Sequence, residues 1–146
     1  MRILIAEDNS TIAMAMATGL ETAGHTVVGP AVANAPALAA ARASPPDLAL
    51  VDIDLQGGDS GFDLAERLNG ELGVPCLFVT GQLGEAIAHE AGCREGGARP
   101  CAALGALGKP FRIAVLLEAV EQALAYAKGG GVPESGGRQR RWFGRG

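Results

Sequence analysis

The sequence lacks the features that mark secreted and membrane-spanning proteins. Its three cysteines are an odd number without a CxxC pair, which indicates reduced thiols rather than a disulfide framework. No apolar stretch is long enough to span a bilayer, and the first ten residues do not have the layout of a signal peptide. We therefore expect a cytoplasmic protein with no membrane span.

Nucleotide-binding and zinc-binding patterns are also missing. The glycines between residues 56 and 61 have neither a Walker lysine nor the GxGxxG spacing, so we interpret them as a turn. His89, Cys93 and Cys101, with Glu90, could supply zinc ligands. Their spacing matches no established zinc finger, and only three of them are strong ligands, which favours ordinary buried or idle thiols.

Charge divides the chain into two parts. Residues 1–128 hold eight Lys and Arg against fifteen Asp and Glu, a net charge of −7, while residues 129–146 hold four Arg against one Glu, a net charge of +3. The acidic part disfavours nucleic acid as its own ligand and suits a cation site. We expect one domain over 1–128, then a Gly-rich linker and a basic, flexible tail over 129–146, too short to fold as a DNA-binding domain. Contact of this tail with nucleic acid, lipid or a protein is left open.

Short apolar runs alternate with longer helical segments, which is the pattern of βα units around a parallel sheet. The expected strands are Arg2–Ala6, His25–Val32, Leu48–Ile53, Pro75–Thr80 and Ala106–Gly108. The expected helices are Ser10–Ala23, Ala35–Ala43, one that begins with Phe62–Leu68, and one that opens at Pro110. Because glycines are frequent between Thr80 and Lys109, any helix near residues 85–91 should be short. The fold class is α/β, with a doubly wound, five-stranded parallel sheet.

Polar side chains follow four of these strands. They are Glu7 and Asp8, Asp52 and Asp54, Thr80, and Lys109. In an open α/β sheet, ligands bind at the carboxyl ends of the strands, so we expect these groups to meet. Carboxylates brought together repel one another unless a hard divalent cation such as Mg²⁺ holds them. A hydroxyl and an ammonium opposite the metal would stabilise a phosphoryl group, so that a carboxylate could accept it as an acyl phosphate.

The same residues carry a resemblance to a known family. The segments IAEDNS, PDLALVDIDL, FVTG and GALGKPF occur in the order of the four signatures of bacterial response-regulator receiver domains. As a set they are highly specific, and the resemblance covers residues 1–128. It implies the flavodoxin-like, three-layer receiver fold.

The resemblance implies a role for each acidic residue at the strand ends and for Thr80. Asp52 would be the phospho-acceptor and, with Asp8, a direct Mg²⁺ ligand. Glu7 would hold the metal through water, and the backbone carbonyl of Asp54 would be a further ligand. Thr80 would hydrogen-bond the phosphoryl group.

Lys109 would pair with the phosphoryl group, and Pro110 would follow a cis peptide bond that aims the lysine inward. Receivers usually have Tyr or Phe where this chain has Ala106, so the sequence is similar to atypical single-domain receivers without the switch aromatic. We therefore expect signalling to use order and disorder of residues 81–104. Gln82, like Asp54, lies where receivers tune hydrolysis of the acyl phosphate.

The resemblance implies a two-component phosphorelay response regulator. A stand-alone receiver would accept the phosphoryl group from a histidine kinase or histidine phosphotransfer protein, and would act by protein–protein contact or as a phosphate sink. It would not be an enzyme beyond its own phosphorylation and dephosphorylation. Two alternatives remain: a phosphatase of the haloacid dehalogenase type, because Asp52-Ile53-Asp54 resembles its DxD motif, or a receiver-like module that is never phosphorylated. A homodimer is left open.

Overall fold

The computed structural model describes residues 1–95, 103–133 and 139–143, with the side chains of 93–95 excepted. The strands are β1 (Arg2–Ala6), β2 (Thr26–Ala31), β3 (Leu48–Val51), β4 (Cys76–Thr80), β5 (Ala103–Gly108) and β6 (Arg140–Trp142). The helices are α1 (Ser10–Thr22), α2 (Asn34–Ala43), α3 (Gly61–Leu72), α4 (Leu83–Glu95) and α5 (Ile113–Ala127), with a 3₁₀ turn at Gln56–Gly58. Strands and helices alternate until β6, as the sequence predicts.

The strands form one sheet in the order β2-β1-β3-β4-β5-β6. The first five are parallel, and this part of the prediction is confirmed. The expected strand number was wrong, because β6 adds a sixth strand that runs antiparallel to β5. It comes from the segment we expected to be a flexible tail, and the described residues 139–143 pack on the sheet instead.

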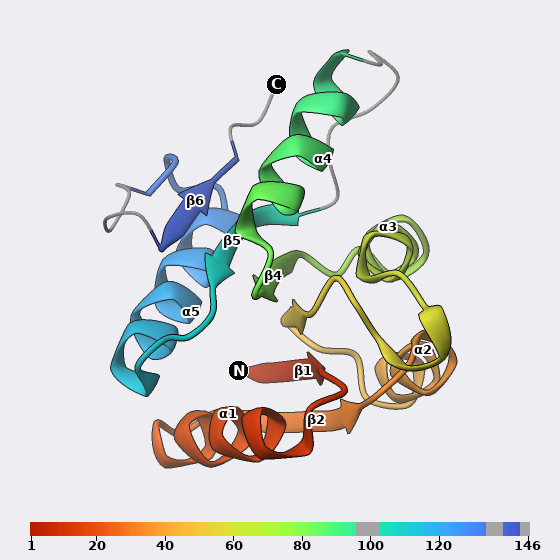
Figure 1. Ribbon diagram of the computed structural model, residues 1–146. Coiled ribbons are helices and arrows are strands. Elements are labelled where there is room, and N and C mark those ends of the chain that lie inside the picture. The colour runs from red at the N-terminus through yellow and green to blue at the C-terminus, as the bar shows by residue number, and fades with distance from the viewer. Residues whose placement is uncertain (96–102, 134–138, 144–146) are drawn as a thin grey trace.

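Helices cover both faces of the sheet, as Figure 1 shows. Ala37, Leu64 and Ala86, from α2, α3 and α4, belong to one buried hydrophobic cluster. Leu20 and Leu116, from α1 and α5, belong to a second cluster on the opposite face. All four residues of β3 are buried, since this central strand has helices on both sides. The three-layer prediction is confirmed.

Side-chain caps mark the beginning of two of the helices. The side chain of Asn9 caps α1 by accepting a hydrogen bond from the amide of Ile12 at 3.1 Å. The hydroxyl of Ser60 caps α3 in the same way. Several predicted bounds were wrong by more than one residue: α4 is thirteen residues long rather than short, α5 begins at Ile113 rather than at Pro110, β3 ends at Val51 rather than at Ile53, and β5 begins at Ala103 rather than at Ala106. Among the described residues, no helix has the length and apolar character needed to cross a membrane.

Candidate functional site

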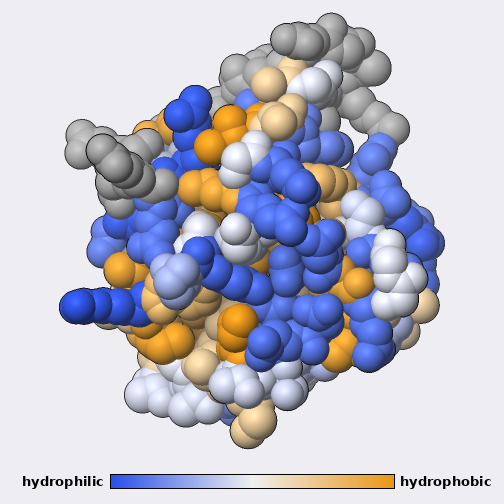
Figure 2. Space-filling view, in the orientation of Figure 1, coloured by the Kyte–Doolittle hydropathy of each residue, from blue (hydrophilic) through white to orange (hydrophobic). Residues whose placement is uncertain are grey.

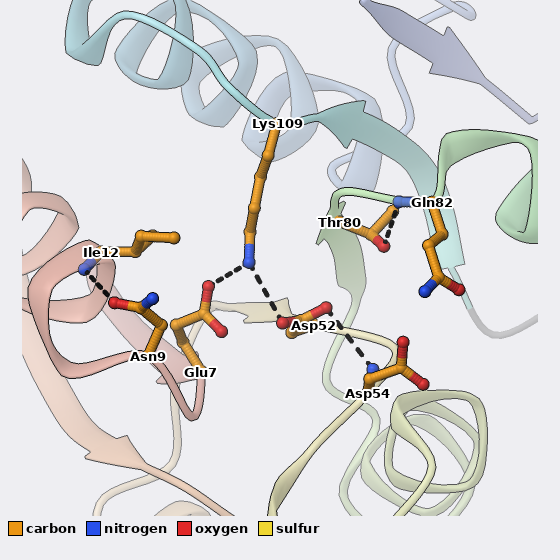
Figure 3. A network of polar contacts seen from close by, with 8 residues as sticks. All are labelled: Glu7, Asn9, Ile12, Asp52, Asp54, Thr80, Gln82 and Lys109. Carbon is orange, nitrogen blue, oxygen red and sulfur yellow. Dashed lines mark hydrogen bonds and ion pairs between the residues drawn. The ribbon is translucent and has the colours of Figure 1, made fainter.

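The carboxyl ends of β1, β3 and β5 bring one lysine and two carboxylates together. Glu7 directly follows β1, Asp52 directly follows β3, and Lys109 directly follows β5. In Figure 3 the lysine side chain points between the two carboxylates. Its ammonium lies 3.1 Å from Oδ2 of Asp52 and also contacts Oε1 of Glu7. The sequence prediction that these groups meet at one edge of the sheet is confirmed by this geometry.

Asp8 completes an acidic group with these carboxylates. One oxygen from each of Glu7, Asp8 and Asp52 lies within 4.8 Å of the others, and no other such group of three occurs among the described residues. Glu7 is 2% exposed, and its Oε2 atom is buried without a hydrogen-bond partner. A buried carboxylate oxygen that lacks a donor is the kind of atom that a metal ion or its bound water satisfies.

The pKa values of Glu7 and Lys109 are shifted because both groups are wholly or partly buried beside other charged groups. Burial, together with the neighbouring Asp52, raises the pKa of Glu7 to about 7, although Lys109 acts in the opposite direction. Burial by itself lowers the pKa of Lys109. Its hydrogen bond to Glu7 and the charge of Asp52 outweigh burial, so this pKa is raised overall. The lysine is therefore cationic at neutral pH, whereas Glu7 is close to its titration point.

Thr80 and Gln82 line the site from the end of β4. Thr80 is 1% exposed, and its hydroxyl oxygen accepts a hydrogen bond from the amide of Gln82 at 2.9 Å. The hydroxyl proton therefore remains free to donate to another group. The amide of Asp54 lies 3.4 Å from Oδ1 of Asp52, and the Asp54 side chain is exposed.

The backbone near the site agrees with one further expectation. The bond between Lys109 and Pro110 is cis, as the resemblance implied. The amide of Lys109 donates to the carbonyl oxygen of Thr80 at 2.8 Å, which ties the loop after β5 to the end of β4.

The structure adds no support for a zinc site at His89, Cys93 and Cys101. The ring of His89 stacks on that of Phe62, with the centroids 3.9 Å apart. Cys101 lies outside the described residues, as does part of the 81–104 segment expected to change order, and the side chain of Cys93 is not described.

Sequence reasoning missed a glycine next to the predicted acceptor. Gly61 begins α3, and a Cβ atom there would lie 1.9 Å from the carbonyl oxygen of Asp52. Only glycine permits this approach of helix to strand end. The amide of Gly61 donates to the carbonyl of Ile53 at 2.8 Å, which fixes the backbone after Asp52. A glycine just after a Ser N-cap was the available signal, but it is also common in ordinary turns.

A groove of about 430 Å³ opens beside the site. Residues of α1, including Ile12 and Met16, line one side, and the segment from Lys109 to Ile113, with Phe111, lines the other. In Figure 2, patches of hydrophobic surface lie at the lower left, where Figure 1 places α1 and the start of α5. The groove is mostly apolar, and Lys109 is its charged member.

Comparisons with known proteins agree with this geometry. The family model of the response regulator receiver domain matches residues 3–121. The transcriptional regulatory protein PdtaR of Mycobacterium tuberculosis is 31% identical over 124 residues, which cover 85% of this chain and 57% of that protein. The phyllosphere-induced regulator PhyR of Methylorubrum extorquens is 34% identical over 125 residues, which cover 85% of this chain and 43% of that protein. The chain thus spans about half the length of these relatives.

Solved structures lead to the same family. The signal receiver domain of a modulated diguanylate cyclase from Desulfovibrio desulfuricans superimposes with a TM-score of 0.72 at 30% identity, over 87% of this chain and 95% of that chain. The match of the family model leaves the haloacid dehalogenase alternative without support. With its strand ends arranged as described, the chain belongs to the response regulator receiver domain family.

Proposed function

We propose that this chain is a two-component signalling protein that accepts a phosphoryl group on Asp52 with Mg²⁺ bound beside it. The observation that carries the proposal is the cluster of Glu7, Asp8 and Asp52 oxygens within 4.8 Å, with the ammonium of Lys109 at 3.1 Å from Asp52. The three carboxylates can bind a cation, and the ammonium of Lys109 can pair with a negatively charged phosphoryl group.

The residues fit a divalent metal ion. Asp8 and Asp52 would hold Mg²⁺ directly, Glu7 would hold it through water, and the Asp54 carbonyl would be a further oxygen ligand. The unpartnered Oε2 atom of Glu7 and its raised pKa support this assignment, because a cation would satisfy the atom and favour the ionised form. When bound, the metal would neutralise charge on the phosphoryl oxygens.

Asp52 would act as the nucleophile. One of its carboxylate oxygens would attack the phosphorus of a phosphohistidine; the P–N bond would break, its electron pair would stay on the histidine nitrogen, and an acyl phosphate would form. Lys109 would then pair with a phosphoryl oxygen. Thr80 would donate its free hydroxyl proton to another, since its oxygen already accepts from Gln82. Hydrolysis by water would return the free carboxylate, with Asp54 and Gln82 flanking its path.

The groove between α1 and the Lys109–Ile113 segment supports a partner protein as the phosphoryl donor. It is apolar and ends at Lys109, so a protein seated there would bring its phosphohistidine to the acidic cluster. Exposed Met14 offers further apolar surface on α1. We propose a histidine kinase or a histidine phosphotransfer protein as this partner, and transmission of the signal by protein–protein contact.

Labelling with acetyl phosphate tests the function. In the presence of Mg²⁺ the chain should gain one phosphoryl group, detected by intact mass and lost on alkaline treatment, and a metal chelator should abolish the gain. Asp52→Asn should remove it. Asp63→Asn is the matched control, because it changes an exposed carboxylate in the first turn of α3 that is outside the acidic group. Equal labelling of wild type and Asp52→Asn would overturn the proposal, and absence of labelling in wild type would favour an unphosphorylated binding module.

A further inference from the structure

The last described segment of the chain docks on β5 over a position, Gly105, that has no room for a side chain. β6 pairs with β5 in the register Gly105 with Trp142, Ala106 with Arg141, and Leu107 with Arg140. A Cβ atom at residue 105 would lie 2.5 Å from the carbonyl oxygen of Arg141 and 2.8 Å from Cε3 of Trp142. The glycine in β5 therefore makes the space that the C-terminal strand fills.

Aromatic side chains hold this strand on both faces of the sheet. Trp142 packs with the α1 and α5 cluster, and Phe143 packs with the cluster of α2, α3 and α4. The hydroxyl of Tyr126 donates to the carbonyl of Phe143, and Arg140 pairs with Glu118 at 3.1 Å. Burial of two aromatic side chains removes a large apolar area from water, which favours docking of a short strand.

Gln139, just before β6, holds the residues on both sides of the catalytic lysine. Its backbone carbonyl accepts from the amide of Gly108 at 2.7 Å, and its side-chain Nε2 donates to the carbonyl of Gly108 at 3.0 Å. The same Nε2 also contacts the carbonyl oxygen of Pro110. A residue thirty positions further along the chain thus fixes the short loop from which Lys109 reaches Asp52.

We propose that Gln139 is a positioning residue for the phosphorylation site, and that docking of the C-terminal strand is coupled through it to the state of Asp52. This inference rests on the proposed function. The loop at Lys109 links the two regions. The side chain of Lys109 contacts Asp52, and the carbonyls of Gly108 and Pro110 contact Gln139. A change in the loop on phosphorylation that alters these contacts would change strand docking, and by linkage docking would then change phosphoryl binding by the same factor.

The chain provides its own reporter for this coupling. Trp142 is the only tryptophan, and it is 7% exposed within the docked strand. Its fluorescence therefore reports on the surroundings of β6, which include Tyr126 of α5. We expect addition of Mg²⁺ and beryllofluoride, an analogue of the phosphoryl group, to change the emission of wild type but not that of Asp52→Asn.

Substitutions at Gln139 in the full chain test the positioning role. Gln139→Leu removes the side-chain N–H donor. Gln139→Glu keeps the shape of the side chain but places a carboxylate oxygen against the carbonyls of Gly108 and Pro110. Both should slow labelling by acetyl phosphate about fivefold to tenfold at saturating Mg²⁺, because the side-chain amide no longer holds the carbonyls of Gly108 and Pro110. The matched control is Arg141→Ala, an exposed side chain in the same strand, which should label at the wild-type rate and keep the emission response.

The outcomes separate the two proposals. If both Gln139 variants match Arg141→Ala in labelling rate and emission response, the positioning role is wrong while phosphorylation of Asp52 stands. If a variant detaches the strand, shown by red-shifted emission without ligand, slower labelling supports the coupling and an unchanged rate overturns it. If wild type is not labelled at all, the proposed function fails, and the positioning role fails with it.

Discussion

The central strands and the β5–β6 edge are held together in different ways. β1 and β3 have strands on both sides and helices on both faces, and their core residues are almost fully buried. β6 has three residues, one neighbouring strand, and a partner strand that reads ALGALG. We expect the centre to open only when the whole domain unfolds, and the edge, which one neighbouring strand holds, to open more easily. Both nevertheless reach the same site, the centre through Asp52 and the edge through Lys109.

A substitution at the central contact should have the largest effect on stability. In Gly61→Ala the new methyl group would overlap the Asp52 carbonyl, and backbone atoms cannot give way as a flexible side chain can. We expect a loss of about 3 kcal/mol in the free energy of unfolding, measured with urea. Labelling of Asp52 should fall as well, since α3 must move away from the acceptor.

Gly70→Ala in the same helix is the control for this experiment. A Cβ atom at residue 70 would have no neighbour within 4 Å, so the change should stabilise the helix by up to about 1 kcal/mol. If both variants unfold at the wild-type urea concentration, the close approach of α3 to Asp52 is wrong.

At the edge, Trp142→Ala should cost about 2 kcal/mol, less than a tryptophan in a central core position. The cost is limited because β6 can detach while the five parallel strands remain folded. Hydrogen exchange distinguishes this from global unfolding: the amide of Phe143, which donates to Leu104 at 2.8 Å, should lose protection, and the amide of Asp52 should keep it. Equal loss of protection at the two amides would contradict independent opening of the edge.

The same contrast explains how far the sequence could be interpreted. The groups of the site follow apolar runs directly, so strand ends and order along the chain are enough to place Glu7, Asp52, Thr80 and Lys109. The fold follows from the same alternation. These features are local in sequence, and the known rule for parallel sheets brings them together.

The rest depends on contacts between distant segments. The segment Arg140–Trp142 is too short and too charged to resemble a strand, and its pairing is fixed by the space over Gly105. The length of α4 was underestimated because glycine propensities ignore tertiary packing, and buried Ala86 anchors this helix on the core. Gln139 has no local pattern that marks its contact, and the signal at Gly61, a glycine after a Ser N-cap, is also common in ordinary turns.

Measured per pH unit, the smallest effect on stability is that of pH on the central carboxylate Glu7. Its pKa is about 7 in the folded chain against 4.5 for an unperturbed glutamate. Between these values the folded state holds a proton that the unfolded state has lost. The free energy of unfolding should therefore fall as pH rises from about 4.5 to about 7, by about 1 kcal/mol per pH unit at most, and this contribution should level off above pH 7.

Urea unfolding in a metal chelator at several pH values between about 5 and about 8 measures this slope. Glu7→Gln cannot titrate and should flatten it. Glu71→Gln is the control, because Glu71 is an exposed carboxylate whose pKa is lowered by Arg42 and Arg67, so its loss should leave the fall between pH 5 and 7 in place. Mg²⁺ should oppose the fall, since it binds the ionised form and is excluded by the proton. A slope that persists in Glu7→Gln would mean that another group of the folded chain takes up the proton.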